Sequence, residues 1–294
     1  MRILVTGAKG QVGSELIQQG ERLGLQMLGA DRAELDITHR NAVHSYIQVQ
    51  QPDIVINAAA YTAVDRAESE SDLAYAINRD GVTYLAQACS ENDIPLFHIS
   101  TDYVFDGNRR GSYSETDLSN PINTYGNSKL EGDNSIESIL KKHIILRVSW
   151  VFGANGNNFV KTILRLGRER DVIRVVSDQY GGPTWAGAIA CTLLSIAKRW
   201  DNGEDILWGT YHYSGQPTAS WYTFAKTILE QAEKLGVIDN RPNVEPITTS
   251  EYSTMAQRPL NTVLNCQKIA EVLNVTQPDW RTDLSQVLTN LRAQ

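Results

Sequence analysis

The chain has 294 residues, of which 41% are hydrophobic and 21% charged, and this ordinary globular composition excludes a disordered or fibrous protein. Its net charge of -7 argues against a nucleic-acid-binding surface, although a local basic patch could still hold one anionic ligand. The three cysteines are widely spaced and form no CxxC pair, so we expect neither a disulfide framework nor a zinc site. The N-terminal apolar run is too short for a signal peptide, and no stretch reaches the roughly 18 apolar residues of a membrane span. We therefore expect a cytoplasmic protein.

Short apolar runs alternate with longer helical patterns in the first half of the chain. The predicted strands lie at residues 2–6, 26–30, 53–60, 95–100 and 143–149. Runs that are apolar throughout suit parallel strands buried on both faces, and the intervening segments, with helical spacing at 10–24 and 71–92, leave room for crossover helices. The pattern predicts an α/β fold built on a doubly wound parallel (Rossmann) sheet.

The regular alternation ends near residue 150, where glycine, proline and asparagine clusters indicate loops. Helical patterns recur at about 157–170, 185–200 and 219–236, and residues 209–215 resemble another strand. We therefore expect residues 1–152, with a return of the chain at 185–214, to form the dinucleotide-binding core. Residues 153–184 and 215–294 would then form a smaller, loop-rich C-terminal substrate-binding region.

A glycine loop joins the first strand to the first helix. Gly7, Gly10 and Gly13 stand at three-residue intervals, with Gln11 and Val12 between the last two. Glycines here permit a tight turn and close approach of backbone N–H groups to a pyrophosphate at the positive end of a helix. The spacing departs from GxGxxG, and a β–α turn without a ligand is the alternative. Its place after a strand and before a helix favours dinucleotide binding.

The second strand ends in two residues that favour different cofactors. Asp31, about 20 residues beyond the glycine loop, suits the ribose 2′-hydroxyl of NAD, whereas the adjacent Arg32 suits the 2′-phosphate of NADP. A solvated Arg32 is an equally good interpretation, so these residues leave the choice of cofactor open. The other residues expected around the cofactor are Asp36, Ile37, Ala59, Ala60 and Tyr61.

Tyr125 and Lys129 stand four residues apart in a predicted helix. Such residues share one helix face, with Cβ atoms about 5–6 Å apart, so the lysine ammonium can lower the pKa of the phenol and make it a general acid. The spacing is common by chance, and an exposed helix face is the alternative. The hydroxyls of Ser100 and Thr101, at the carboxyl end of a predicted strand, favour chemistry because they could bind a carbonyl oxygen.

The motifs "TGAKGQVG", "STDYVFDG", "YGNSKLEGD" and "RVSWVFG" resemble those of the extended short-chain dehydrogenase/reductases over nearly the whole chain. Within that family, "NNFVKTILRL" and "DQYGGPT" resemble the reductases that form dTDP-L-rhamnose, a precursor of cell-surface polysaccharide. The resemblance implies NAD(P)H-dependent reduction of the C4 ketone of a dTDP-linked 6-deoxy-4-keto-sugar. It also implies NADPH as the cofactor, with NADH as a second one.

The same resemblance implies roles for individual residues. Tyr125 would be the acid, Lys129 would lower its pKa and hold the nicotinamide ribose, and Thr101 would polarise the carbonyl. Asp102 and Trp150 would contact the sugar. Both Tyr125 and Lys129 would thus touch the cofactor as well as serve catalysis.

Candidate substrate contacts beyond the sugar are less specific. Asn158, Lys161 and Arg165 form one helical stripe that could meet the diphosphate and nucleoside, or simply face solvent. Arg258 could clamp a phosphate or be an ordinary surface arginine. Two alternative functions stay open: a reductase or epimerase of another nucleotide-sugar, and a non-catalytic subunit of the kind found with methionine adenosyltransferase.

Metal binding is not expected, although some relatives hold Mg²⁺ at a subunit contact through a glutamate matched by Glu15. The later acidic partners are missing here, since residues 186–194 and 284–294 contain no carboxylate. One protein carboxylate seldom holds magnesium without other oxygen donors. We therefore interpret Glu15 as an acidic residue in the first turn of a helix, and we expect that a homodimer would not need metal.

Overall fold

The computed structural model describes residues 1–292, and six parallel strands form its central sheet in the order β10-β5-β4-β3-β1-β2. The strands are β1 (Arg2–Thr6), β2 (Gln26–Ala30), β3 (Ile54–Asn57), β4 (Leu96–Thr101), β5 (His143–Val148) and β10 (Gly209–Tyr213). The five strands predicted in the first half are confirmed, with β3 shorter than expected. The strand-like run near 209 forms the edge of the sheet, where β10 pairs with β5.

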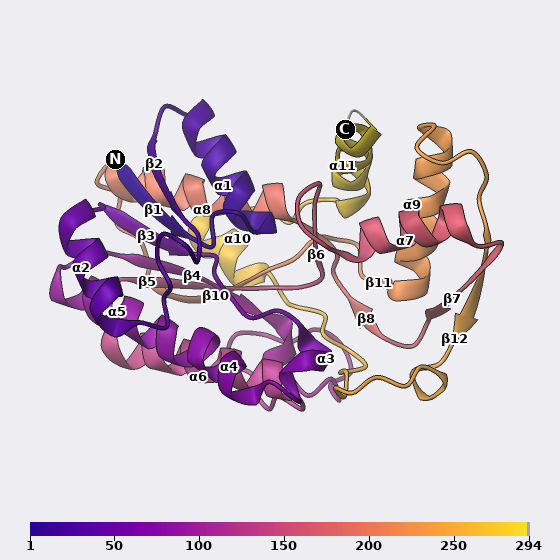
Figure 1. Cartoon of the computed structure of the whole chain (residues 1–294), viewed down its shortest axis with the longest axis horizontal. Coiled ribbons are helices and arrows are strands. Elements are labelled where there is room, and N and C mark those ends of the chain that lie inside the picture. The colour runs from indigo at the N-terminus through magenta and orange to yellow at the C-terminus, as the bar shows by residue number, and fades with distance from the viewer. Residues whose placement is uncertain (293–294) are drawn as a thin grey trace.

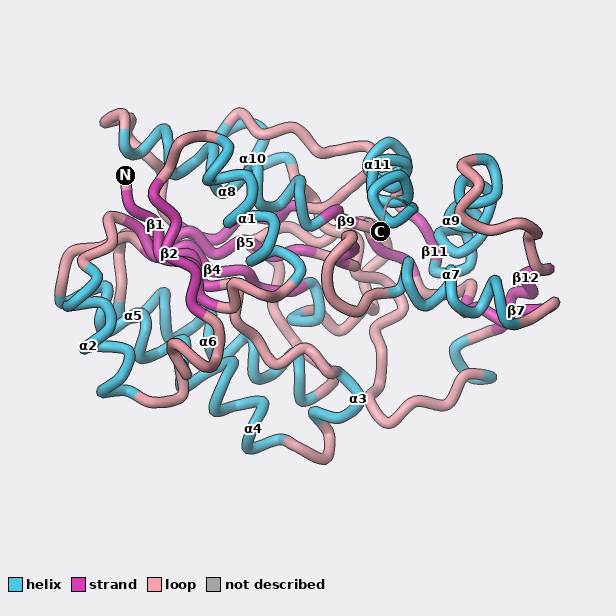
Figure 2. The backbone as a smooth tube through the Cα atoms, turned by 45° about the horizontal axis from the view of Figure 1, so that its top comes forward, coloured by secondary structure: helices cyan, strands magenta, loops and turns pink. Residues whose placement is uncertain are grey.

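Helices cover both faces of this sheet (Figures 1 and 2). On one face lie α1 (Gln11–Arg22), α8 (Ala186–Asp201) and α10 (Gln267–Leu273), and on the other α2 (Arg40–Gln50), α5 (Val82–Glu91) and α6 (Thr124–Ile139). Alternate residues of one strand serve the two faces, because Ile3 and Val5 pack with α1 and α8 while Leu4 packs with α2 and α5. This confirms the doubly wound parallel fold.

The direction of winding reverses beside β1, which lies between β3 and β2. Ligands of open α/β sheets bind in the crevice outside the carboxyl ends of the strands at such a reversal. The glycine loop follows β1, and residues 58–61 follow β3, so both predicted cofactor segments border the crevice. The sheet topology thus agrees with the predicted position of the cofactor.

The predicted helix at 71–92 is interrupted. It consists of α4 (Ser71–Tyr75), a π-helical stretch (Ala76–Gly81) and α5. A Cβ at Gly81 would lie 2.7 Å from Ile37 Cγ1, so this glycine lets the π-helical stretch approach the segment after β2. Single-turn π-bulges inside helices are frequent at functional sites. The short helix α3 (Val64–Ala67) precedes this group.

The second half of the chain contains a separate set of elements, on the right in Figure 1. They are α7 (Phe159–Glu169), β7 (Val172–Val176), α9 (Trp221–Lys234), β12 (Asn243–Ile247) and α11 (Trp280–Arg292). Phe224, Ile228, Trp280 and Leu284 form the centre of their own hydrophobic cluster. The region is less loop-rich than expected, because β7 pairs with β12 and α11 packs against α9. The division into two domains stays a prediction.

Four two-residue strands connect the second region to the rest of the chain. They are β6 (Val151–Phe152), β8 (Tyr180–Gly181), β9 (Thr184–Trp185) and β11 (Ala219–Ser220). β6 pairs with β9, and β8 pairs with β11. Across residues 1–292, no helix has the length and apolar character needed to cross a membrane.

Candidate active site

The glycine loop has the geometry of an anion-binding turn. Gly7 has φ +68°, and a Cβ there would lie 2.6 Å from Ala59 N, so only glycine fits. Gly10 N–H donates to Gly7 O at 2.9 Å and closes the turn, while a Cβ at Gly13 would overlap that same oxygen. Among the described residues, no side chain caps the helix start at Gln11. The first N–H groups of α1 therefore keep their capacity to bind an anion.

Two cations lie where the cofactor ribose is predicted to bind. Lys9, in the glycine loop, forms an ion pair with Asp31 at the end of β2, and Arg32 Nε lies 3.2 Å from Asp36 Oδ2. Hydrogen bonding to Glu34 and Lys9 holds the pKa of the Asp31 carboxyl below its usual range. Lys9 was not predicted as a site residue, although it stands within "GAKG". Its charge offsets that of Asp31 and makes the site more favourable to a phosphate.

The predicted contacts after β3 are held by two asparagines. Asn57 Oδ1 accepts from Ala59 N at 3.1 Å, and Asn78 Oδ1 accepts from Tyr61 N at 2.8 Å. Asn78 Nδ2 also donates to Ser128 Oγ on α6 at 3.0 Å. The Ala59-to-Tyr61 segment is thereby fixed between the glycine loop and α6. Asn78 was not predicted, and its position in the π-helical stretch is visible only in the structure.

Two side chains, from the N-cap residue and from the loop after α3, hold the start of α6. The N-cap residue Asn123 accepts from Gly126 N at 2.8 Å, and its Nδ2 donates to Gln257 O at 2.9 Å. Glu68 accepts from both N and Oγ1 of Thr124. Such capping satisfies N–H groups that a helix start would otherwise leave unpaired. The backbone at Tyr125, the residue after Thr124, is therefore held in place.

Tyr125 lies beside the end of β4. Its ring is 5.8 Å from that of Tyr103 in an edge-to-face arrangement. Burial raises the pKa of the Tyr125 phenol above its usual range, while hydrogen bonding with Thr101 acts in the opposite direction. Thr101 Oγ1 also donates to Asp102 Oδ1 at 3.2 Å. The structure thus brings Tyr125, Thr101 and Asp102 together, as predicted.

The expected effect of Lys129 on the phenol is wrong for this arrangement. The pKa of Tyr125 is raised, and Lys129 Nζ contacts β4, where it lies 2.8 Å from Ile99 O and 3.0 Å from His98 Nε2. Lys129 is 1% exposed, and burial lowers its pKa to about 8. Burial is the largest cause of both shifts, because it disfavours the charged form of each group. A phenol with a raised pKa keeps its proton at neutral pH, which is the form a proton donor needs.

Ser100 does not join Thr101, because neighbouring residues of a strand point to opposite faces. Its hydroxyl donates to Asp133 Oδ2 on α6 at 2.8 Å, and Arg147 Nε lies 3.3 Å from the same oxygen. All three residues are buried. Asp133 follows Lys129 by four residues, as Lys129 follows Tyr125, and this repeated spacing was the signal that could have found it.

Asp102 is 3% exposed, and its carboxylate accepts hydrogen bonds from Ser149 Oγ at 2.8 Å and from Thr101 Oγ1. Burial raises the pKa of its carboxyl to about 6, and hydrogen bonds from Thr262, Ser149 and Thr101 limit the rise. Asp102 therefore orients the Thr101 hydroxyl in the structure. Its predicted contact with the sugar stays a prediction.

Trp150 and Asn158 lie toward the second region. The Trp150 ring stacks on Trp221, with centroids 3.5 Å apart and planes 6° apart, and its backbone adopts a left-handed φ of +46°. Asn158 caps α7, and its Nδ2 donates to Gln11 Oε1 at 2.9 Å. Asn158 therefore links α7 to the glycine loop. The exposed Arg165 pairs with Glu169, as a solvated helix face would.

Arg258 is neither free in solvent nor far from the site. Its Nη2 donates to Asp65 Oδ2 on α3 at 2.8 Å, and its charge acts on the pKa of Tyr103. Burial raises the pKa of Tyr103 to about 12 in spite of Arg258. The guanidinium thus connects the C-terminal segment to the end of β4, where a substrate phosphate could reach it.

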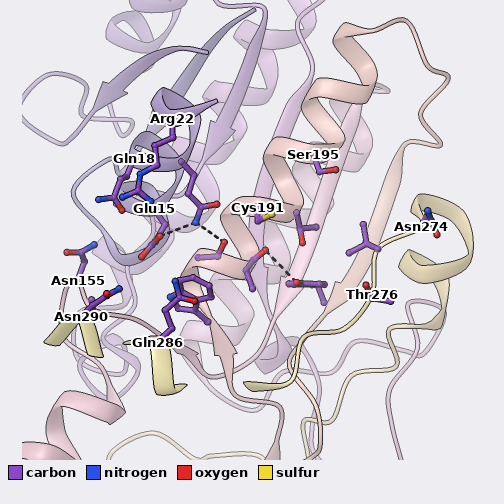
Figure 3. A pocket seen from close by; sticks show the side chains of 18 residues that line it. Glu15, Gln18, Arg22, Asn155, Cys191, Ser195, Asn274, Thr276, Gln286 and Asn290 are labelled. Carbon is purple, nitrogen blue, oxygen red and sulfur yellow. Dashed lines mark hydrogen bonds between the residues drawn. The ribbon is translucent and has the colours of Figure 1, made fainter. Parts of the chain in front are cut away.

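Glu15 borders a separate groove of about 860 Å³ between α1, α8 and α11 (Figure 3). It lies beyond the first turn of α1, so the predicted helix-dipole explanation is wrong. Its carboxylate is 8% exposed and accepts from Gln19 Nε2 at 3.1 Å. Of the described residues that line the groove, Glu15 alone carries a carboxylate. Across residues 1–292, no three histidine, cysteine or carboxylate side chains gather to hold a metal ion.

We accordingly expect EDTA to leave both activity and oligomeric state unchanged. One carboxylate does not meet the near-octahedral oxygen ligation that magnesium requires. Reductase assays and size-exclusion chromatography, each with and without chelator, provide the measurement. Activity that is lost in EDTA and restored by added Mg²⁺ would contradict this expectation.

A doubly wound sheet with a glycine loop after β1 and a Tyr-x-x-x-Lys pair beside a hydroxyl at the end of β4 defines the class of extended short-chain dehydrogenase/reductases. The family model described as "RmlD substrate binding domain" matches residues 1–293. The dTDP-4-dehydrorhamnose reductase of Aggregatibacter actinomycetemcomitans is 46% identical over 99% of this chain and 98% of its own. The chain belongs to the dTDP-4-dehydrorhamnose reductase family.

Solved structures agree with this assignment. The dTDP-4-dehydrorhamnose reductase of Clostridium acetobutylicum has a TM-score of 0.92 at 37% identity and covers 99% of this chain and 100% of its own. The Bacillus anthracis reductase, solved in complex with NADP, has a TM-score of 0.91 at 37% identity and covers 98% and 99%. Similarity therefore extends over both regions of the chain.

Proposed function

We propose that this chain uses NADPH to reduce the C4 ketone of a dTDP-linked 6-deoxy-4-keto-sugar to the alcohol of dTDP-L-rhamnose. The observation that carries the proposal is the meeting of Tyr125, on α6, with Thr101, at the end of β4, in a chain that matches the reductase family throughout. We place the reaction in the cytoplasm, which suits three cysteines that are all free.

The residues of the predicted cofactor site suit NADPH. Gly7 and Gly13 let the turn and the start of α1 pack closely against neighbouring backbone, and the uncapped start of α1 suits a pyrophosphate. Lys9 and Arg32 suit a 2′-phosphate. When bound, NADPH supplies the hydride that adds to the ketone carbon.

The side chains provide the proton. Addition of a hydride to the ketone carbon places negative charge on its oxygen, and the Tyr125 Oη proton neutralises that charge as the C–H bond forms. We assign to Thr101 a hydrogen bond to the same oxygen and to Asp102 the orientation of Thr101. Lys129 would then serve the ribose and the phenol from the next turn of α6.

The second region offers a place for the nucleotide. A cavity of about 320 Å³ is lined by the aromatic side chains of Phe159, Trp221 and Tyr252, with Arg258 among the lining residues. Aromatic faces suit a pyrimidine base, and a guanidinium suits a diphosphate. Asn158 caps the helix that forms one wall, so its predicted contact with substrate would be made from the edge of this cavity.

The test is a panel of dTDP-, UDP- and GDP-linked 4-keto-sugars, each incubated with the purified protein and NADPH. Oxidation of NADPH should be fastest with the dTDP sugar, and chromatography should identify the 4-hydroxy product. Faster turnover of a UDP or GDP sugar would favour another nucleotide-sugar reductase. Cofactor binding without turnover of any sugar would favour a non-catalytic subunit.

For the cofactor, Arg32→Ala should weaken NADPH more than NADH. The side chain of Arg32 is exposed, so its contribution is that of a surface ion pair, a loss of about 2–5-fold specific to NADPH. Fluorescence titration with both cofactors measures the two dissociation constants. Equal losses for the two cofactors would mean that Arg32 does not contact the 2′-phosphate. Arg168→Ala, on the far region at the end of α7, is the control.

A further inference from the structure

A buried chain of hydrogen bonds crosses the sheet from β1 to the predicted catalytic helix. Thr6 Oγ1 donates to Asn57 Oδ1 at 2.6 Å, Asn57 Nδ2 lies 2.9 Å from His98 Nδ1, and His98 Nε2 lies 3.0 Å from Lys129 Nζ. Each of the four residues is at most 1% exposed. The reaction described above uses Lys129 and leaves the other three without a role.

The direction of these bonds follows from a backbone group that can only donate. Ala59 N–H donates to Asn57 Oδ1 at 3.1 Å, which identifies that atom as the oxygen and places Asn57 Nδ2 toward His98. The His98 Nδ1 atom must therefore accept a hydrogen bond. Burial holds the pKa of His98 far below its usual range, so the ring is neutral. A neutral ring that accepts at Nδ1 carries its proton on Nε2.

This proton faces Lys129. An ammonium has three donors and no acceptor, so it cannot form a hydrogen bond with a donating Nε2–H. A neutral amine can accept that hydrogen and still donate to Ile99 O, which is 2.8 Å from Lys129 Nζ. The observed contacts of Lys129 are thus those of its neutral form.

We propose that His98 is a positioning residue whose Nε2–H holds Lys129 against β4 while Lys129 is a neutral amine. When Lys129 gains a proton, it leaves His98 and moves toward the tyrosine side of α6. This inference rests on the role of Lys129 in the proposed reductase. The hydrogen bonds of Asn57 and His98 would keep Lys129 ordered in the core while it is neutral. Binding of the nicotinamide ribose would then favour the protonated, released form.

Charges on the neighbouring elements make both forms accessible. Asp133, on the same helix, favours the ammonium, and its Oδ1 lies 3.8 Å from His98 Nε2. Burial opposes it and lowers the pKa of Lys129 to about 8. The other charged or titratable groups on elements packed against α6 are His143 and Arg147 on β5, Asp102 and Tyr103 after β4, Asp65 and Arg66 on α3, Asp72 and Tyr75 on α4, Arg79 and Asp80 in the π-helical stretch, and Tyr84, Cys89 and Glu91 on α5.

The first test reads the tautomer of His98 directly. In the full-length protein with ¹⁵N-labelled histidine, long-range NMR spectra should show one ring that carries its proton on Nε2 and does not titrate between about pH 6 and 9. The signal is assigned by its loss in His98→Gln. A proton on Nδ1, or a ring that titrates in this range, would overturn the proposal. This reading is independent of whether the protein reduces a sugar.

The second test compares His98→Leu with His98→Gln. Leucine removes the donor to the neutral amine, so the pKa of Lys129 should rise and NADPH affinity should persist to a pH about 0.5–1 unit higher. Glutamine places an N–H group, which cannot titrate, at the position of Nε2. The pH midpoint of NADPH binding in His98→Gln should therefore be close to that of the unmodified protein. A midpoint unchanged in His98→Leu, or shifted equally in both variants, would overturn the proposal. If His98→Leu fails to fold, the tautomer of the unmodified protein decides.

Discussion

Tyr125→Phe should lower turnover by about 10²–10⁴-fold, the usual contribution of a general acid, and leave NADPH affinity nearly unchanged. The variant loses the hydroxyl that carries the transferred proton, while the ring keeps its edge-to-face contact with Tyr103. The glycine loop lies on a different part of the sheet edge and is untouched. Steady-state kinetics with the dTDP sugar and a separate NADPH titration measure the two effects.

Tyr75→Phe is the matched control for this change. Tyr75 ends α4, and its ring lies under Arg79, away from the glycine loop, so its hydroxyl has no part in the proposed chemistry. Its turnover should equal that of the unmodified protein. If Tyr125→Phe lost no more than about threefold in activity, the loss would be far smaller than the usual contribution of a general acid. Another group would then have to supply the proton.

Lys129→Met should reduce both turnover and cofactor affinity. A single amine is proposed to serve the phenol and the nicotinamide ribose, and hydrogen bonds to charged groups contribute about 1.5–3 kcal/mol, or roughly 10–150-fold in NADPH affinity. Methionine also leaves the His98 Nε2–H without its partner in the core. Kinetic assays and cofactor titrations on the same preparation measure whether the two losses occur together.

Lys142→Met provides the control, because that lysine pairs with Asp93 at the surface before β5. It should leave turnover and cofactor affinity as they are. An unchanged NADPH affinity in Lys129→Met would exclude the ribose contact while leaving a role beside the phenol intact. Thermal unfolding of both variants separates these effects from a loss of folded protein.

Local pattern was enough to predict the central sheet and the elements at its carboxyl edge. Apolar runs such as "RILVT" are buried on both faces of a parallel sheet, and the structure confirms them as strands. The glycines at positions 7, 10 and 13 occupy a turn that a Cβ would block. These features depend on residues close together in the chain, so the sequence alone was enough for the fold class, and it also predicted a cofactor loop and the Tyr125–Lys129 pair.

Tertiary contacts decided what surrounds that pair. The Lys129 amine contacts His98, 31 residues earlier, and Arg258 pairs with Asp65, 193 residues earlier. Helical spacing placed Lys129 and Tyr125 on one face, and it carried no information on how burial would change the pKa of each. The expected lowering of the phenol pKa failed for this reason, since desolvation is a property of the packed core.

The sequence by itself thus determined the strands of the central sheet, the glycine turn and the spacing of the candidate proton donor, because periodicity and backbone freedom act over a few residues. Only the tertiary structure showed that Lys9 neutralises Asp31, that Asn78 holds the segment after β3, and that His98 meets Lys129 in the core. Those contacts join separate strands, loops and helices, and they exist only after the sheet has assembled.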